Sequence, residues 1–87
     1  MDNRLNLNID SDNATPVFQQ LVDQIHFAIN TGDLAAGDRL PSIRALASEH
    51  HLATNTVAKA LRQLEFRGLL IARDRSGYVV ANVDDNR

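Results

Sequence analysis

Apolar residues recur at intervals of three and four through residues 16–30, which is the spacing of one face of an α-helix. A cluster of turn-forming residues precedes this segment, and Gly32 provides a stop just beyond it. Thr15 can cap the helix with its hydroxyl, and Pro16 suits the first turn. The buried stripe is expected to hold Phe18, Leu21, Val22, Ile25, Ala28 and Ile29.

Two further helices are predicted, over residues 43–50 and 54–67, joined by a tight connection. Ser42 is expected to cap the first of them, and Gly68 to end the second. Ala53 cannot cap, so we expect Thr54 to take that part. The inward residues are expected to be Ile43, Leu46, Ala47, Val57, Ala60, Leu61 and Leu64.

The last third of the chain predicts a β-hairpin, with strands over 69–73 and 78–81 around a turn at 74–77. Alternation at residues 5–9 indicates a short extended segment with one apolar side, and residues 32–41 are predicted to be a loop.

The predicted order is therefore helix, helix, short turn, helix and hairpin. Two helices joined by a three- to four-residue turn are typical of a helix-turn-helix, and the hairpin adds a wing. The fold class is mainly α with a small β-hairpin, a winged helix-turn-helix of three helices plus wing. We expect an N-terminal extended segment and turn at 1–15, the winged domain at 16–81, and a polar tail at 82–87.

The composition is that of a globular domain, with 44% hydrophobic and 23% charged residues in a chain of 87. The sequence contains no run long enough for a membrane helix and no pattern of a secretory signal. It has no cysteine, which excludes disulfides and thiolate metal sites and fits a reducing cytoplasm. We therefore expect a cytoplasmic protein with no membrane partner.

The net charge of −2 conceals an uneven distribution. Residues 1–38 hold one base and six acids, a net charge of −5, whereas residues 39–75 hold seven bases and three acids, a net charge of +4. Residues 76–87 add −1, which restores the total. A local basic face is what phosphate binding requires, so the middle of the chain is the candidate nucleic-acid surface.

Residues 16–80 contain four motifs in a fixed order. The stretch GDLAAGDRLPSIRALA fits the pattern G-x-L-x-x-G-x-x-L-P-S-x-R-x-L-A at every fixed position, after PVFQQLVDQI and before NTVAKALRQLEFRGL and GYVV. In these motifs and their order, the segment closely resembles the N-terminal domain of the GntR family of transcription regulators. Ala58, where many members have arginine, and the extended segment before Pro16 resemble the YtrA-type branch.

Base reading is expected at the start of the third helix, because a helix in the major groove reads bases with side chains near its N-terminus. Thr54, Asn55 and Thr56 lie there, and Asn55 can pair with adenine through two hydrogen bonds. Lys59 follows one turn later on the same side and could reach a phosphate, and Gln63 extends that line. The alternative is that the first three residues serve only as a helix cap.

The remaining contacts are implied by the resemblance. It assigns the family's DNA-contacting arginine to Arg44, and it makes Arg73, Arg75 and Gly77 a wing that enters the minor groove. Arg75 replaces the first wing glycine of the family, so this wing could equally rest on a phosphate. Arg44 has the alternative of an ordinary surface charge, which is the role we expect for Arg62 and Arg67, on other sides of the third helix.

Neither catalysis nor metal binding is predicted, and no cofactor is expected. The three histidines, His26, His50 and His51, lack partners at ligand spacing, and no nucleophile-and-base pair occurs at a suggestive spacing.

The resemblance implies a homodimer on a pseudo-palindromic operator in double-stranded DNA, more often repressing than activating. It also implies a C-terminal domain, absent here, that binds a small-molecule effector and dimerises. Two alternatives remain open. One is a winged helix used only for protein interaction, which the polar start of the third helix argues against. The other is the head of an aminotransferase-like fusion regulator.

Overall fold

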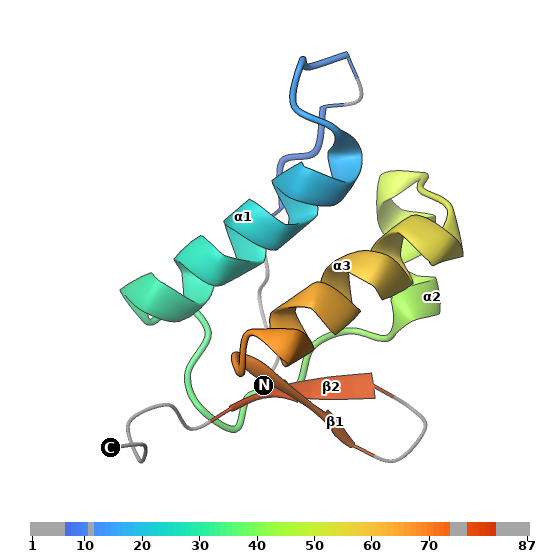
Figure 1. Ribbon diagram of the computed structural model, residues 1–87. Helices are drawn as coiled ribbons and strands as arrows, with labels where there is room; N and C mark the ends of the chain where they lie inside the picture. The colour runs from blue at the N-terminus through green and yellow to red at the C-terminus, as the bar shows by residue number, and fades with distance from the viewer. Residues whose placement is uncertain (1–6, 11, 74–76, 82–87) are drawn as a thin grey trace.

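The computed structural model describes residues 7–10, 12–73 and 77–81, and its elements follow the predicted order (Figure 1). The bounds agree with the predicted ones to within one or two residues. The elements are α1 (Val17–Thr31), α2 (Ile43–His50), α3 (Thr54–Phe66), β1 (Leu70–Arg73) and β2 (Gly77–Val80).

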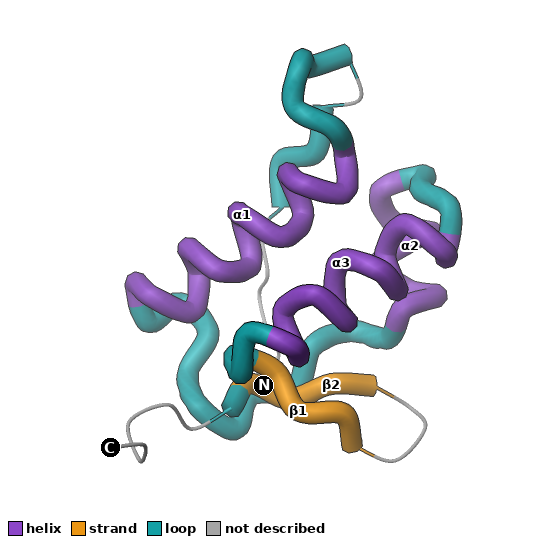
Figure 2. Tube along the Cα trace, viewed as in Figure 1, coloured by secondary structure: helices purple, strands orange, loops and turns teal. Residues whose placement is uncertain are grey.

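The core lies where α1 packs against α3, and α2 packs against the other side of α3 (Figure 2). The predicted stripes supply most of its side chains, and the loop after α1 adds Leu34 and Leu40. Phe18, Ile29 and Ile43 are only half-buried, at the margin of the core. The third helix is therefore held between two others, and one long side of it remains open to solvent. The fully buried large side chains are Leu21, Val22, Ile25, Leu46, Val57, Leu61, Leu64 and Leu70.

The predicted cap of α1 is wrong. The helix begins at Val17 with Pro16 as its N-cap residue and has no side-chain cap, so Thr15 lies one position too early. Proline forces the residue before it into an extended conformation, which keeps Thr15 outside the helix. The carbonyl of Thr15 instead accepts a hydrogen bond from the side chain of Gln20. At the other end Gly32 adopts the left-handed conformation, as predicted.

The turn between α2 and α3 comprises three residues and is closed by backbone hydrogen bonds. Ser42 caps α2 as predicted, because its hydroxyl accepts from the N–H of Ala45 at 3.0 Å. His51 adopts left-handed angles, φ 56° and ψ 49°, and the N–H of Leu52 donates to the carbonyl of Ala47 at 2.8 Å. This pairing ends the helix and reverses the chain toward α3.

The predicted cap of α3 is also wrong. Ala53 is the N-cap residue, no side chain caps the helix, and Thr54 is already its first helical residue. A capping side chain must come from the non-helical residue before the first turn, and Thr54 lies past that point. The first turn of α3 therefore keeps its leading N–H groups free of a side-chain cap.

The wing is an antiparallel hairpin whose register pairs Leu70 with Val80 and Arg73 with Gly77. The prediction placed Leu69 and Ala81 in the strands, but they lie just outside, joined by one hydrogen bond of 2.9 Å. Gly77, predicted to belong to the turn, begins β2.

The loop predicted over residues 32–41 is partly extended, which the sequence did not indicate. Segment 37–40 pairs with the free edge of β2, through hydrogen bonds of 2.8 to 2.9 Å and a bridge between Arg39 and Val79. This segment, which begins with Gly37, becomes extended because β2, far along the chain, offers an unpaired edge.

Candidate nucleic-acid interface

The start of α3 presents polar side chains to solvent. Thr54 and Asn55 are exposed, and Thr56 is half-buried. The first turn carries no side-chain cap, and the N–H of Thr56 donates to the carbonyl of Ala53 at 3.1 Å. The positive end of the helix dipole, at the N–H groups of Thr54 and Asn55, can therefore attract an anion. The helix start therefore combines hydrogen-bonding side chains with a phosphate-attracting backbone.

One line of exposed side chains runs along α3 opposite its buried stripe. Val57, Ala60, Leu61 and Leu64 face inward, so helical geometry puts residues 55, 59, 62 and 66 on the outward line. These residues are Asn55, Lys59, Arg62 and Phe66, and all four are exposed.

Arg62 was predicted to point away from Asn55 and Lys59, and this was wrong. Three residues after Lys59, it lies on the same outward line, and that spacing was available in the sequence. Arg67 does lie elsewhere, as predicted, because its guanidinium Nη1 is 3.4 Å from Nδ1 of His26 on α1. Helical geometry puts Thr56 and Gln63 on the same α1-facing flank as Arg67, and both are half-buried. Gln63 was predicted to extend the line of Asn55 and Lys59, and it lies to one side of that line.

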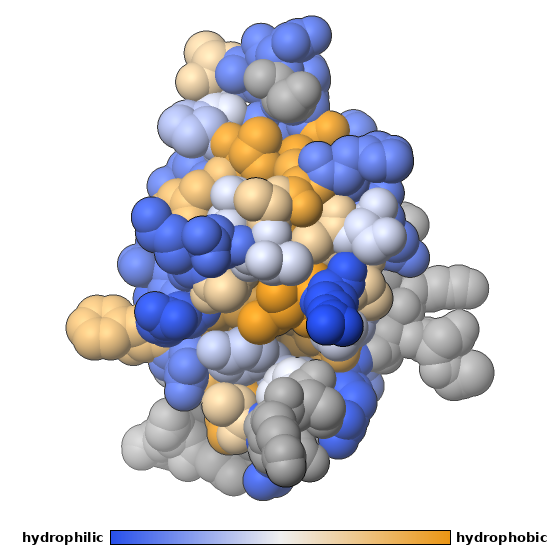
Figure 3. Space-filling model, turned by 90° about the vertical axis from the view of Figure 1, so that its right-hand side faces the viewer, coloured by the Kyte–Doolittle hydropathy of each residue, from blue (hydrophilic) through white to orange (hydrophobic). Residues whose placement is uncertain are grey.

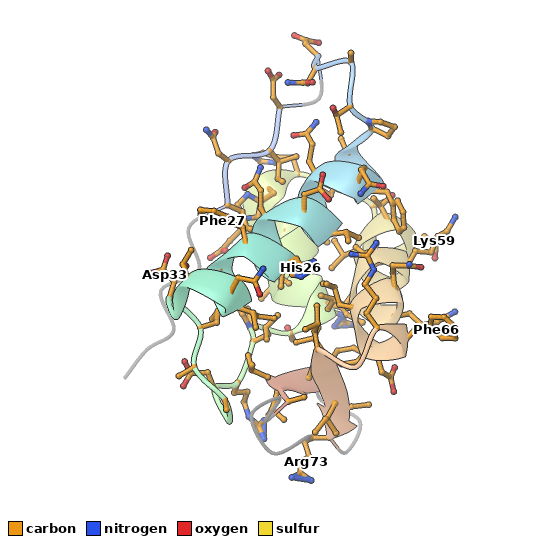
Figure 4. The ribbon with its side chains drawn as sticks, turned by 60° about the vertical axis from the view of Figure 1, so that its left-hand side comes forward. His26, Phe27, Asp33, Lys59, Phe66 and Arg73 are labelled. Atoms are coloured by element: carbon orange, nitrogen blue, oxygen red, sulfur yellow. The ribbon has the colours of Figure 1, made fainter. Side chains whose placement is uncertain are left out.

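A shallow hollow of about 420 Å³ lies between α1 and the middle of α3. The ammonium of Lys59 is 6.0 Å from the centroid of the Phe18 ring, a weak cation–π contact that steadies the lysine. Phe66 at the end of α3 is 86% exposed, and Figure 4 shows it projecting from the same side of the helix as Lys59. The lining residues are Phe18, Lys59, Arg62, Gln63 and Phe66.

Arg44 is exposed near the start of α2, the helix that packs on α3. Figure 3 views the molecule from the right-hand side of Figure 1, the side on which α2, the start of α3 and the hairpin lie. Hydrophilic side chains gather at its margins, and apolar atoms appear between them. Arg44 therefore adds an exposed cation on the helix that packs against α3.

The wing carries basic residues on its outer face. Arg73 is exposed opposite Gly77 at the far end of the hairpin, whereas Arg75 lies outside the described residues. Directly paired and alternate residues share a face of a sheet, so Arg39, bridged to Val79, projects on the same side as Arg73. Sequence reasoning missed Arg39, since only the pairing with β2 gives this residue a direction.

A hydrogen bond ties the wing to α3. The hydroxyl of Tyr78 on β2 donates to Oε1 of Glu65 at 3.3 Å. Partial burial raises the pKa of Tyr78 above its ordinary value, the Glu65 charge and hydrogen bond add to this, and the charge of Arg62 opposes it. The phenol therefore stays neutral and keeps donating its proton to Glu65 at physiological pH.

Within residues 7–10, 12–73 and 77–81, no three histidine or carboxylate side chains cluster in a way that could hold a metal ion. In the same described part of the chain, no helix has the length and apolar character to cross a membrane.

Three helices, a three-residue turn between the second and third, and a hairpin wing define a winged helix-turn-helix domain. The model of the family "Bacterial regulatory proteins, gntR family" matches residues 18–80, so the chain belongs to the GntR family. This is a family of regulatory proteins and not of enzymes.

Two curated relatives are matched over most of this chain. The HTH-type transcriptional regulator Rv1152 of Mycobacterium tuberculosis is 37% identical, over 90% of this chain and 64% of its own length. The HTH-type transcriptional repressor YtrA of Bacillus subtilis is 35% identical, over 87% of this chain and 59% of its own length. The chain thus spans less than two thirds of each of these relatives.

Solved structures support the same family and the resemblance to YtrA proteins. YtrA from Sulfolobus acidocaldarius, a GntR-family transcription factor, is 41% identical with a TM-score of 0.81, covering 87% of this chain and 80% of that one. The DNA-binding domain of AraR in complex with operator ORR3 is 26% identical with a TM-score of 0.73. That similarity covers 85% of this chain and 89% of the AraR domain.

Proposed function

We propose that this chain is the DNA-binding domain of a transcription regulator and that it reads a specific operator in double-stranded DNA. The observation that carries the proposal is the uncapped, polar start of α3, continued by an exposed line with two cations. A similar domain, that of AraR, has been solved on operator DNA, which supports the same partner here.

In this proposal α3 enters the major groove with its N-terminus toward the bases. Asn55 pairs with adenine through its side-chain amide, and Thr54 and Thr56 offer hydroxyls, with the methyl of Thr56 available to thymine. Because Thr54 does not cap the helix, its hydroxyl is free for this contact.

The cations hold the backbone of the DNA. Arg44 and Lys59 contact phosphates, Gln63 assists from the flank, and the outward line adds Arg62. The wing lies on the minor groove or the adjoining phosphates through Arg73, Arg75 and Gly77.

The intact regulator is proposed to be a homodimeric repressor acting in the cytoplasm on a pseudo-palindromic operator. The relative YtrA is named a repressor, and both relatives extend beyond the matched region. Residues 16–81 form the reading domain, and residues 1–15 and 82–87 flank it. Dimerisation and the binding of a small-molecule effector belong to a further region of the regulator.

The test is selection of duplexes from a random pool, followed by titration over a salt series. Enriched duplexes should share a half-site, and Asn55→Ala should cost about 1–3 kcal/mol and relax preference at one position. Arg44→Ala and Lys59→Ala should weaken binding to all sequences and lower the slope of log K against log salt by about 1 each.

Arg67→Ala is the matched control, because it removes one positive charge from the α1-facing flank of the same helix. Its salt slope should equal that of the parent. If no duplex is enriched at low salt, even with two covalently linked copies, the proposal fails and a protein-binding role takes its place.

A further inference from the structure

Two glutamines one turn apart on α1 have a role that the DNA surface does not explain. Gln20 is the one polar residue that is buried within the described part of the chain, with 7% of its surface exposed, and Gln24 is half-buried. Both lie beside the segment of residues 7–10, which folds back along the start of α1 (Figure 1). Burying an amide costs free energy unless its hydrogen bonds are made, so the hydrogen-bond partners of these glutamines indicate their role.

Each amide pairs with both backbone groups of one residue in that segment. Oε1 of Gln20 accepts from the N–H of Asp10 at 2.8 Å, and its Nε2 donates to the carbonyl of Asp10 at 2.8 Å. Oε1 of Gln24 accepts from the N–H of Asn8 at 2.8 Å, and its Nε2 donates to the carbonyl of Asn8 at 3.0 Å. Gln20 also donates to the carbonyl of Thr15 at 2.7 Å.

The spacing of the two elements makes this double pairing fit. Residues four apart on a helix are separated by about 6 Å along its axis. Residues two apart on a strand are separated by about 6.6 Å, with their N–H and C=O groups toward the same side. The amides at positions 20 and 24 therefore match the backbone of positions 8 and 10, as a neighbouring strand would.

The other side of the segment contacts the core. Leu7 and Ile9 are half-buried and pack against the core cluster, whereas the side chains of Asn8 and Asp10 are exposed. None of the five glutamine hydrogen bonds to this region involves a side chain of residues 7–10. Recognition by the glutamines thus depends on the backbone alone, and the apolar side chains set which face turns inward.

We propose that Gln20 and Gln24 form a backbone clamp, an interaction surface for one extended strand, and that its occupant is residues 7–10 of the same chain. The clamp makes the N-terminal segment part of the folded domain and closes the core beside α1. The clamp contributes to folding and not to DNA binding, so its test does not depend on the proposed function.

The connection between the segment and α1 favours the same chain over a second copy. The N–H of Asn13 donates to the carbonyl of Asp10 at 3.2 Å, and the N–H of Thr15 donates to Oδ1 of Asn13 at 2.9 Å. These bonds reverse the chain within a few residues, and closing so short a loop has a small entropic cost.

Hydrogen exchange of the backbone amides, followed by NMR on the whole chain, tests the clamp directly. Gln24→Met keeps the side chain's length but removes its hydrogen bonds, so the Asn8 amide should exchange at least about tenfold faster while the Asp10 amide stays protected. Gln20→Met should release the Asp10 amide and lower Tm by about 4–8 °C or more.

Gln19→Met is the matched control, since the side chain of Gln19 donates a hydrogen bond to Asp23 within α1 and its replacement should leave both amides protected. Asn8→Pro removes the N–H itself and is therefore compared by Tm, which it should lower about as much as Gln24→Met does, whereas Asn8→Ala should leave Tm unchanged. If the Gln20→Met protein does not fold, amide exchange in the Gln24→Met protein still tests the clamp, because Gln24 is only half-buried.

Unprotected Asn8 and Asp10 amides in the parent chain would overturn the clamp, as would equal Tm values for Asn8→Ala and Asn8→Pro. Protection that rises with protein concentration, together with dimers in sedimentation, would show that two copies exchange segments and would overturn occupancy by the same chain.

Discussion

His51 occupies a backbone conformation that suits glycine better than histidine. Its angles of φ 56° and ψ 49° lie in the left-handed region, where a Cβ crowds the backbone. The turn nevertheless requires this conformation, because the backbone bonds from residues 51 and 52 close the end of α2 and direct the chain into α3. Such turns often carry glycine for this reason.

We expect His51→Gly to stabilise the domain by about 0.5–1 kcal/mol, since relief of the Cβ crowding exceeds the added entropy of the unfolded chain. Urea unfolding of the parent and of the His51→Gly protein measures this change in the free energy of unfolding. His50→Gly is the control, and it should destabilise, because His50 is the last residue of a regular helix. A less stable His51→Gly protein would contradict the argument.

Capping decides how each helix begins. Of the three hydroxyl side chains considered as caps, Ser42 accepts a first-turn hydrogen bond, while α1 and α3 have no side-chain cap. Thr15 and Thr54 have suitable side chains at unsuitable positions, each displaced by one residue from the N-cap. Proline at position 16 and the three-residue turn before α3 fix these positions.

Ser42→Ala should destabilise the domain by about 1 kcal/mol, because it leaves the N–H of Ala45 without its acceptor. Thr54→Ala should change stability by less than about 0.5 kcal/mol, since that side chain caps nothing. Thermal unfolding of both variants checks the pair. Equal losses of stability would show that Thr54 also caps.

The contact between Tyr78 and Glu65 joins the wing to α3 and depends on pH. A raised pKa means that the folded state favours the neutral phenol, whose contribution to stability is present below pH of about 10 and is lost as the pH rises through the raised pKa. Glu65→Gln should lower the Tyr78 pKa toward its ordinary value.

The ultraviolet absorbance of tyrosinate measures this titration without interference, because the chain has one tyrosine and no tryptophan. Arg62→Ala removes the opposing charge and should raise the Tyr78 pKa further. If the pKa of Tyr78 is the same in Glu65→Gln as in the parent protein, burial alone raises it.

Over the whole chain, the acids and bases are unevenly distributed along the sequence. The net charge is −5 in residues 1–38, which include α1, and +4 in residues 39–75, which include α2, α3 and β1. A local excess of bases can attract a polyanion although the total charge is negative. In the proposed function a single domain contacts one half-site, so its affinity depends on how copies are joined.

Two copies of the domain in one covalent chain should bind a duplex with two half-sites about 10²–10⁴-fold more tightly than the single domain does. The gain reflects a high effective concentration at the second half-site and needs no new contact. Titration with duplexes of one and of two half-sites measures it. A linked protein that gains nothing on the two-site duplex would contradict the proposed arrangement of half-sites.

Local patterns in the sequence predicted the helices and the hairpin, because hydrophobic spacing and turn residues act over a few neighbours. They also indicated the polar start of α3 and the alternating segment at residues 5–9. Its apolar side is confirmed at Leu7 and Ile9, and residues 5 and 6 lie outside the described residues. The roles of Arg44, Asn55 and Lys59 on DNA stay predictions.

Only the tertiary structure decided which side chains depend on distant partners. The strand-like segment at 37–40 exists because β2 offers it an edge, and that pairing gives Arg39 its direction. The burial of Gln20 also depends on the tertiary structure, because its hydrogen-bond partner is the backbone of Asp10, ten residues earlier in the chain. Sequence patterns determine what each element can form alone, whereas unpaired edges and buried polar groups are resolved only by whatever the fold brings beside them.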